Sequence, residues 1–378
     1  MPLPIHLAFT PYPSFSPSHT NLTFIPPIMS FYNSYPGFLY RQFLVCPSKP
    51  PSSTSLRGDT GVITGANTGL GYQAAAQLLS LGLSHLILAV RSPTKGQAAR
   101  KKLLSTLPVS TKPPVIEVWE LDLADYKSIV SFVERLKQSK LTIDFAILNA
   151  GVANFDYTTN PITSHENSIQ INWLSNALLT MLLLPHLDCQ AQANLNRPRP
   201  VISVVGSETA AWAKFKEAKT STESGISLRQ ALDDRKNFDM GDRYYASKLL
   251  QQLFFVELVD HRSKANRSSG AVLNMVNPGF CYGSELHRTA EGSFAVVLGS
   301  IKRVVGRSTS TGARTLVHGA VLAGTPSNGK YLSDCRLGPF AGYENRENGR
   351  DTQRKVWEET IAELRGVVTN MDDVLGTI

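Results

Sequence analysis

A tyrosine and a lysine four residues apart are the first candidates for chemistry in this chain of 378 residues. Tyr244 and Lys248 open a segment with helical spacing, so their side chains should share one face, one turn apart. A neighbouring ammonium favours the phenolate and should lower the pKa of the phenol from about 10 by about 1–3 units. The pair is suited to proton exchange near neutral pH, although an ordinary amphipathic helix would carry the same spacing.

A hydroxyl and an amide follow two other apolar segments. Ser207 comes directly after the segment 201–205, and Asn149 ends the segment 143–149. The carboxyl ends of parallel strands meet at one edge of a sheet, where ligands bind. Ser207 could therefore hold a substrate oxygen while Tyr244 exchanges a proton with it. A polarised carbonyl beside a nicotinamide would make a hydride-transfer site.

Short apolar segments alternate with longer helical ones from residue 60 onwards, which is the pattern of βαβ units. The predicted strands are 60–65, 85–91, 115–121, 143–149, 200–206, 271–276 and 329–333. The predicted helices are 69–82, 94–107, 125–139, 164–187, 241–264, 284–304, 308–323 and 350–366. We therefore predict an α/β fold with a single Rossmann-type, doubly wound parallel sheet of about seven strands and helices on both faces.

The first predicted strand leads into a glycine-rich turn, TGANTGLG, at residues 64–71. Gly65, Gly69 and Gly71 would allow a tight turn and a close approach of backbone N–H groups to a pyrophosphate at the start of the next helix. The same glycines could serve only a tight turn. Their place at the head of a βαβ unit, before a helix of small residues, favours dinucleotide binding.

The second predicted strand ends in a cation. Arg91 stands at its tip, Lys95 follows four residues later, and no carboxylate is present there. An acidic residue at this position would bind a ribose 2′-hydroxyl, whereas a cation suits a 2′-phosphate. NADP(H) is favoured over NAD(H), although a surface arginine would look the same.

Composition narrows the class of protein. The net charge of +8 is spread over a chain with only 18% charged residues, which argues against a nucleic-acid partner or firm membrane association. No run of 18 apolar residues occurs. The four cysteines form no CxxC pair, so we expect no metal site and a reducing, cytoplasmic location.

The front of the chain differs from the rest. Eleven of the 22 prolines lie in the first 51 residues, and no acidic residue precedes Asp59. We predict a disordered leader over residues 1–58, with Met29 as a possible natural start, and one catalytic domain over 59–378.

Five motifs together resemble those of the short-chain dehydrogenases/reductases. They are the turn at 64–71, Asn149-Ala150-Gly151, Val205-Gly206-Ser207, Tyr244 to Lys248, and Asn277-Pro278-Gly279, in the family's order. The long interval from Ser207 to Tyr244 resembles the retinol dehydrogenase and protochlorophyllide reductase subgroup. The segments MGDRYYASK and VNPGFCYGSEL are most similar to the corresponding segments of fungal family members that serve secondary-metabolite pathways.

The resemblance implies a role for each matching residue. Tyr244 would be the general acid/base, Lys248 would lower its pKa and hold the nicotinamide ribose, and Ser207 would position the substrate oxygen. Asn172 would maintain a proton relay to the lysine, and Asp122 would contact the adenine. The expected cofactor-binding residues are Gly65, Asn67, Thr68, Gly69, Leu70, Gly71, Arg91, Lys95, Asp122, Asn149, Ala150, Gly151, Tyr244, Lys248, Pro278 and Gly279. Ser284 stands near the place where the family often has a threonine for the carboxamide, and its role stays open.

The leading hypothesis is an NADP(H)-dependent oxidoreductase (EC 1.1.1.-) acting on a carbonyl/alcohol pair of an apolar small molecule. Segments 207–240 and 280–305 would form the pocket walls through Trp212, Phe215, Phe280, Tyr282, Leu286, Phe294 and Val297. The alternatives are a membrane-surface retinol- or sterol-type dehydrogenase anchored by residues 31–45, and a catalytically silent dinucleotide-binding regulator. By analogy with the family, the helices 164–187 and 241–264 could pair in a homodimer or homotetramer.

Overall fold

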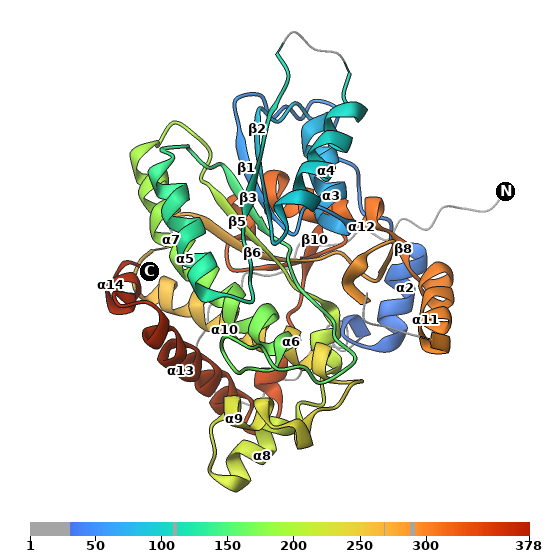
Figure 1. The fold of residues 1–378 in the computed structure, drawn as a ribbon, viewed down its shortest axis with the longest axis vertical. Coiled ribbons are helices and arrows are strands. Elements are labelled where there is room, and N and C mark those ends of the chain that lie inside the picture. Colours follow the sequence, from blue (N-terminus) through green and yellow to red (C-terminus); the bar gives the residue numbers. More distant parts are fainter. Residues whose placement is uncertain (1–30, 109–111, 268, 288–291) are drawn as a thin grey trace, which may run out of the picture.

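Eight strands form one twisted sheet at the centre of the computed structural model, which describes residues 31–108, 112–267, 269–287 and 292–378. The sheet order is β10-β9-β6-β5-β4-β1-β2-β3, and all neighbours run parallel except β10 against β9. The strands are β1 (Thr60–Thr64), β2 (His85–Val90), β3 (Val115–Glu120), β4 (Phe145–Leu148), β5 (Val201–Val205), β6 (Val272–Asn277), β9 (Tyr331–Ser333) and β10 (Arg336–Gly338). The predicted doubly wound α/β fold is confirmed, with one edge strand, β10, that the sequence did not indicate (Figure 1).

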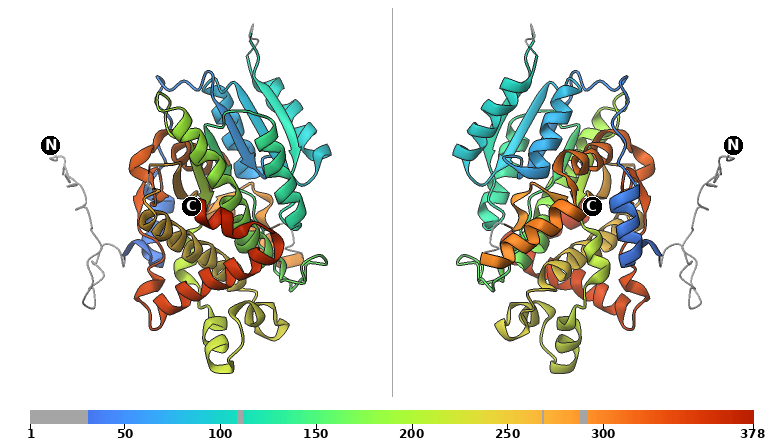
Figure 2. Two further views of the ribbon diagram at one scale, coloured as in Figure 1. Left: turned by 90° about the vertical axis from the view of Figure 1, so that its left-hand side faces the viewer. Right: turned by 90° about the vertical axis from the view of Figure 1, so that its right-hand side faces the viewer.

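Helices cover both faces of this sheet (Figures 1 and 2). One face carries α3 (Gly69–Ser80), α4 (Pro93–Thr106) and α12 (Thr309–Val317), and the other carries α5 (Tyr126–Gln138), α7 (Ser175–Ala193), α10 (Arg243–Lys264) and α13 (Gly349–Val367). Successive strand residues point to opposite faces, so Val62 belongs to one buried cluster and Ile63 to the other. Because both faces are covered, every residue of the central strands β1, β4, β5 and β6 is buried.

Three predicted helices are more irregular than expected. The segment 164–187 is divided into α6 (Asn167–Ile169), a π-helical turn at Gln170–Leu174, and α7, which runs on past Pro185. The segment 308–323 ends in a second π-helical turn, His318–Leu322. The segment 284–304 begins as a short 3₁₀ turn, Glu285–His287, and α11 spans Gly292–Val305.

The long connection after β5 has structure of its own. It starts with a 3₁₀ turn at Glu208–Trp212 and continues through α8 (Lys216–Ser224) and α9 (Leu228–Asp233). After β6, the two-residue strands β7 (Cys281–Tyr282) and β8 (Arg307–Ser308) pair beside α11. The chain ends in α14 (Met371–Thr377).

The expectation of a disordered leader is wrong for residues 31–58. They include α2 (Tyr35–Leu44), which begins with Ser34 as the N-cap, accepting a hydrogen bond from Gly37 N. Pro36 lies in the first turn of this helix, where proline is tolerated because its missing N–H has no partner there anyway. A high proline content alone therefore did not predict disorder correctly in this segment. Residues 1–30, with Met29, lie outside the described part of the chain.

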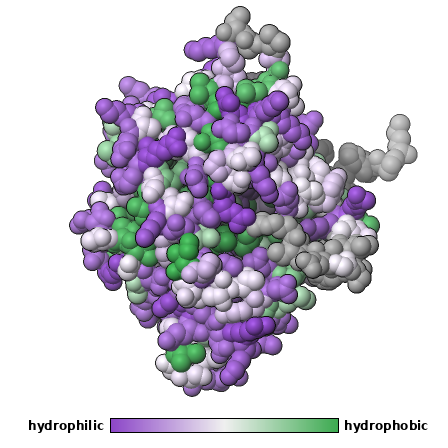
Figure 3. Space-filling view, viewed as in Figure 1, coloured by the Kyte–Doolittle hydropathy of each residue, from purple (hydrophilic) through white to green (hydrophobic). Residues whose placement is uncertain are grey.

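Apolar side chains are mostly in the interior. On the face shown in Figure 3, hydrophilic residues predominate and the hydrophobic ones occur in small groups. None of the helices in the described residues is long and apolar enough to cross a membrane.

A buried histidine, His165, connects the end of α9 to α13. His165 is 3% exposed, and its Nδ1 lies 2.8 Å from Asp233 Oδ2 at the end of α9. Its Nε2 lies 3.1 Å from Glu363 Oε1 on α13. Burial alone would lower the pKa of His165, but the two carboxylates outweigh burial and raise it to about 9.

The charge of His165 should make stability depend on pH. The folded pKa of about 9 lies above the ordinary 6.5, so the stabilisation is fully present below about pH 6.5 and is lost as the pH rises through 9. We expect His165→Gln to lower the free energy of unfolding by about 1–3 kcal/mol at pH 6.5 and by clearly less at pH 9.5. Urea denaturation of both proteins across this range is the measurement. A deficit of equal size at both ends would exclude the charge as its source.

Candidate active site

One large pocket opens at the carboxyl ends of the parallel strands, with a volume of about 740 Å³. It lies at the point where the strand order reverses, between β1 and β4, which is where ligands bind in open α/β sheets. The predicted site residues that line it are Gly65, Asn67, Thr68, Gly69, Leu70, Arg91, Lys95, Asp122, Asn149, Ala150, Gly151, Ser207, Tyr244, Lys248, Pro278 and Gly279. Two predicted residues, Gly71 and Asn172, lie behind its wall instead.

The glycine turn between β1 and α3 is packed too closely against its neighbours to take side chains at Gly65 and Gly71. Gly65 and Gly69 have φ angles of +64° and +59°, a region that favours glycine. A Cβ atom on Gly71 would lie 2.6 Å from the Gly65 carbonyl oxygen and 2.7 Å from Asn149 Nδ2. Asn149 in turn donates from Nδ2 to the Thr64 carbonyl at 3.0 Å, which joins the ends of β1 and β4.

This turn can receive an anion. The helix α3 starts at Gly69, and its N-cap Thr68 makes no side-chain capping hydrogen bond. The first N–H groups of a helix attract negative charge through the helix dipole. The backbone conformation of the turn and the helix dipole therefore fit the pyrophosphate of a dinucleotide.

Cations line the pocket beyond the turn. Arg91 and Lys95 are exposed side chains at the end of β2 and the start of α4. Ser92 between them caps α4 through Lys95 N at 3.4 Å. Asp122, after β3, is held by Ala124 N at 2.9 Å and also lines the pocket. A positive wall of this kind is suited to a phosphate.

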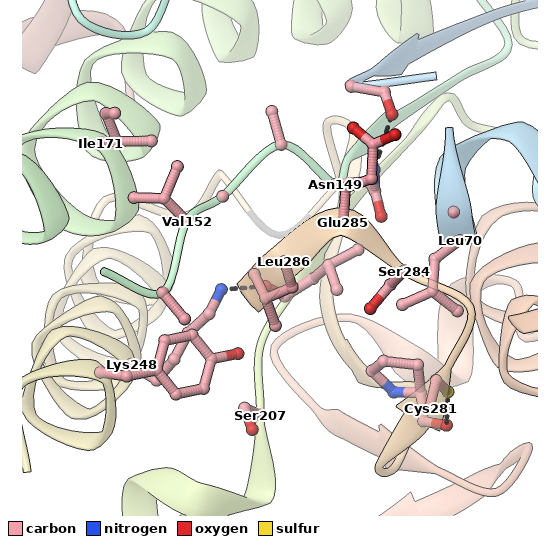
Figure 4. Close-up of a pocket in the computed structure, with 18 of the residues that line it drawn as sticks. Leu70, Asn149, Val152, Ile171, Ser207, Lys248, Cys281, Ser284, Glu285 and Leu286 are labelled. Carbon is pink, nitrogen blue, oxygen red and sulfur yellow. Dashed lines mark hydrogen bonds between the residues drawn. The ribbon is translucent and has the colours of Figure 1, made fainter. Parts of the chain in front are cut away.

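The catalytic candidates meet at the opposite part of the pocket. The helix α10 carries Tyr244 and Lys248 one turn apart, as predicted. The chain after β5 brings Ser207 to the side of the pocket where Lys248 lies (Figure 4). The side chains of Tyr244 and Ser207 line the same part of the pocket, and Ser207 acts on the pKa of Tyr244. Lys248 Nζ donates to the Val205 carbonyl at 2.8 Å and to Gln251 Oε1 at 3.0 Å. Lys248 is 5% exposed.

Burial controls the pKa of both groups. It raises the pKa of Tyr244 to about 12, against the opposing hydrogen bond with Ser207. It lowers the pKa of Lys248 to about 7. The expected lowering of the Tyr244 pKa by Lys248 is thus wrong for this structure, because desolvation dominates and the opposing contribution comes from Ser207 rather than from Lys248. Tyr244 is a phenol at neutral pH and can act as a proton donor.

Asn172 holds two parts of the site together from outside the pocket. It lies in the π-helical turn, where its Nδ2 donates to the Val152 carbonyl at 2.7 Å and to Ser247 Oγ at 2.9 Å. Its Oδ1 accepts from Val152 N at 2.9 Å. These bonds fix the segment after β4 against α10, next to Lys248.

The segment after Pro278 folds over the glycine turn. A Cβ atom on Gly69 would lie 3.4 Å from Ser284, which lines the pocket with Leu286 (Figure 4). The carbonyl of Leu286 accepts a hydrogen bond from Ala153 N at 3.2 Å. Ser284 is therefore close to the glycine turn.

The predicted pocket walls are only partly right. Trp212, Phe280 and Leu286 line the pocket. Phe215 instead lies in the core, 2% exposed, because its backbone turns it inward against Tyr343. Tyr282 is 40% exposed and lines no part of the pocket. The side chains of Phe294 and Val297 lie outside the described part of the structure.

Several lining residues were missed by sequence reasoning. They are Tyr35, Phe38, Phe155, Glu208, Met240, Tyr245, Ile301 and Val305. Tyr35 and Phe38 belong to α2, and their spacing of three residues could have indicated a helical face. Among the described residues, no group of three or more His, Cys, Asp or Glu is placed to hold a metal ion.

Comparison with known proteins gives consistent matches. A family model described as short chain dehydrogenase matches residues 60–211. The short chain dehydrogenase/reductase mfmJ of Annulohypoxylon moriforme is 36% identical over 88% of this chain and 94% of its own length. The short-chain dehydrogenase fogG of Aspergillus ruber is 38% identical over 85% and 89%, respectively.

Solved structures share the fold. A protein of Mycobacterium paratuberculosis superposes with a TM-score of 0.54 at 23% identity, covering 83% of this chain and 97% of that one. A 3-ketoacyl-(acyl-carrier-protein) reductase of Brucella melitensis, complexed with NADH, gives 0.51 at 16% identity, with 74% and 97% covered. At these identities the likeness concerns the fold alone.

Burial of Lys248 should cost stability in a pH-dependent way. Its folded pKa of about 7 lies below the ordinary 10.5, so unfolding takes up a proton between these pH values and stability rises with pH across that window. We expect Lys248→Met to be more stable than the wild type at pH 6.5, and the difference to shrink toward pH 10. Urea denaturation without added dinucleotide measures this, with the exposed Lys101→Met as control. A difference that does not vary with pH would contradict the lowered pKa.

Proposed function

Because this chain belongs to the short-chain dehydrogenase family, we propose that it is an NADP(H)-dependent oxidoreductase for a carbonyl or alcohol group of an apolar organic molecule. The observation that carries the proposal is one continuous pocket with the glycine turn and cations along one part and Ser207, Tyr244 and Lys248 at another. A protein that only senses a dinucleotide has no need of the second part.

The pocket residues would together form a binding site for the whole dinucleotide. The turn at Gly65 and Gly69 and the start of α3 would hold the pyrophosphate. Arg91 and Lys95 would hold a 2′-phosphate, and Asp122 the adenine end. Lys248 would hold the nicotinamide ribose, because its ammonium lies beside the pocket floor. The nicotinamide, when bound, supplies or accepts the hydride.

The protein's own residues supply the proton. Ser207 and Tyr244 would both donate hydrogen bonds to the substrate oxygen, which polarises the carbonyl. As hydride reaches the carbonyl carbon, the Tyr244 hydroxyl gives its proton to the developing alkoxide, and the product is the neutral alcohol. A phenol with a raised pKa remains a far stronger acid than an alcohol, so the transfer stays favourable. Lys248, one turn away, would then stabilise the phenolate.

The relatives with the higher sequence identity support a physiological setting. Two of them, mfmJ of Annulohypoxylon moriforme and fogG of Aspergillus ruber, come from fungi. We infer a role in a fungal secondary-metabolite pathway, in the cytoplasm. The free state of all four cysteines supports a reducing compartment.

Removal of the Tyr244 hydroxyl should stop the reaction without emptying the site. We expect Tyr244→Phe to lower kcat for ketone reduction by at least about 100-fold, since general acid catalysis contributes about that much, while NADPH binding stays nearly intact. NADPH oxidation and fluorescence titration measure the two quantities. Tyr343→Phe, a buried tyrosine away from the pocket, is the control. Wild-type turnover by Tyr244→Phe would refute the assigned role.

Cofactor choice should depend on the charge at the end of β2. We expect Arg91→Asp to weaken NADPH binding by at least about tenfold, because a charge-assisted contact is replaced by repulsion, and to leave NADH binding much less affected. Dissociation constants for both dinucleotides measure this. Lys101→Asp makes the same charge change on an exposed residue of α4 outside the pocket. Equal weakening of both dinucleotides would remove the 2′-phosphate assignment.

A further inference from the structure

A row of aromatic rings runs from α2 to the catalytic tyrosine. Phe38 packs edge-on against Trp212, with ring centroids 5.2 Å apart, and Tyr35 lies 5.8 Å from the same indole. Trp212 lies 6.1 Å from Tyr245, which lies 6.4 Å from Tyr244. All five side chains line the pocket. The substrate side of the pocket thus has an aromatic wall that ends at the proposed proton donor.

The helix α2 is fixed to both sides of the pocket by hydrogen bonds. Gln42 Nε2 donates to the carbonyls of Phe280 at 2.9 Å and Val305 at 3.0 Å, and its Oε1 accepts from Phe280 N at 3.1 Å. On the other side, Trp212 Nε1 donates to the Asn33 carbonyl at 3.0 Å. The helix lies beside α11, so it closes the gap between the two substrate segments (Figure 1).

A network of buried ion pairs also holds α2 in place. Arg41 pairs with Glu208, the residue after Ser207, and lies 3.7 Å from Asp334. Asp334 also pairs with Arg307, whose Nη2 donates to the Arg41 carbonyl at 3.1 Å. All four side chains are less than a tenth exposed. Breaking one such buried pair is costly, so α2 is a built part of the site.

We propose that α2 makes this pocket selective for flat, fused-ring aromatic carbonyl compounds, with Phe38 and Trp212 as the specificity-determining residues. The inference rests on the proposed function and deepens it. Aromatic rings contact each other favourably face to edge or with offset stacking, beyond what the buried area provides. A flat ring system that continues the row toward Tyr244 would place its carbonyl at the Ser207 and Tyr244 hydroxyls.

The apolar lining of the pocket agrees with a substrate of this kind. Around the aromatic wall the other lining side chains include Phe155, Met240, Ile301 and Val305. Glu208, the carboxylate nearest to Ser207 in the chain, is already paired with Arg41. Asn154, Thr209 and Glu285 also line the pocket, so its hydrogen-bonding groups are not confined to the place of the carbonyl; the apolar part of the ring system would lie against the aromatic wall.

Two ketones with the same carbon skeleton test the inference. 1-Tetralone and 1-decalone have their carbonyl at the same position of two fused six-membered rings, but only 1-tetralone contains an aromatic ring. The full-length enzyme with NADPH should prefer 1-tetralone in kcat/KM. We expect Phe38→Leu and Trp212→Leu, which keep apolar volume but remove the ring, each to lower the ratio of the two kcat/KM values by about three- to tenfold.

A matched variant and a binding measurement complete the design. Phe43→Leu makes the same change on α2 at a side chain that is 56% exposed and outside the pocket, and should leave the ratio unchanged. Calorimetric titration of the NADPH complex with 1-tetralol and 1-decalol, which cannot react because dinucleotide and alcohol are both reduced, reports selectivity without turnover, and thermal unfolding checks that the variants fold.

The outcomes separate the two proposals. Selective binding of 1-tetralol that depends on Phe38 and Trp212, without reduction of either ketone, would support the aromatic site and refute the oxidoreductase function on such carbonyls. Reduction of both ketones with a ratio unaffected by Phe38→Leu and Trp212→Leu would overturn the aromatic site and leave the oxidoreductase standing. Binding of neither alcohol, or of both equally, would also overturn the substrate class.

Discussion

The parallel direction of the strands is the constraint on which the rest of the structure depends. Parallel neighbours need a long crossover, so each strand is followed by a helix that returns across one face. Both faces are then covered, and the central strands are buried along their whole length. All strand ends that carry polar residues meet at one edge. Ser207 and Lys248 come together there although they are far apart in the chain, because β5 ends where α10 begins to cover the sheet.

The site places charged and polar groups where burial opposes them. Lys248 and Tyr244 both have pKa values shifted toward their neutral forms by desolvation. The folded chain holds them there through contacts that the chemistry itself does not use, such as the bonds of Asn172 to Val152 and Ser247. Stability is supplied elsewhere, by the two apolar clusters on either side of the sheet and by pairs such as His165 with Asp233. Such a separation, with shifted pKa values inside the site and stabilising contacts outside it, is typical of functional sites.

Local patterns predicted the sheet and the centre of the site, and failed where distant contacts decide. The strands, the glycine turn and the Tyr244–Lys248 spacing depend on residues close in sequence, so the motif carries its own geometry. The helix α2 depends on Arg41 reaching Glu208, 167 positions away, and on Trp212 reaching Asn33. A proline-rich segment gives no sign of such partners. The prediction of a lowered Tyr244 pKa was wrong for the same reason. Helical spacing indicates a neighbouring cation but not how deeply the phenol is buried.

The 3₁₀ turn after β5 joins catalysis to the shape of the pocket. Within this one turn, Ser207 carries the hydroxyl for the substrate oxygen, Glu208 holds Arg41 of α2, and Trp212 contacts the rings of α2. The Ser207 hydroxyl also accepts from Thr209 N at 3.3 Å, and its carbonyl accepts from Gln252 Nε2 at 3.0 Å, so the turn is fixed to α10. A displacement of α2 would therefore act on the turn that bears the catalytic serine. In this chain the wall that would select the substrate and the hydroxyl that would polarise it are parts of one rigid unit.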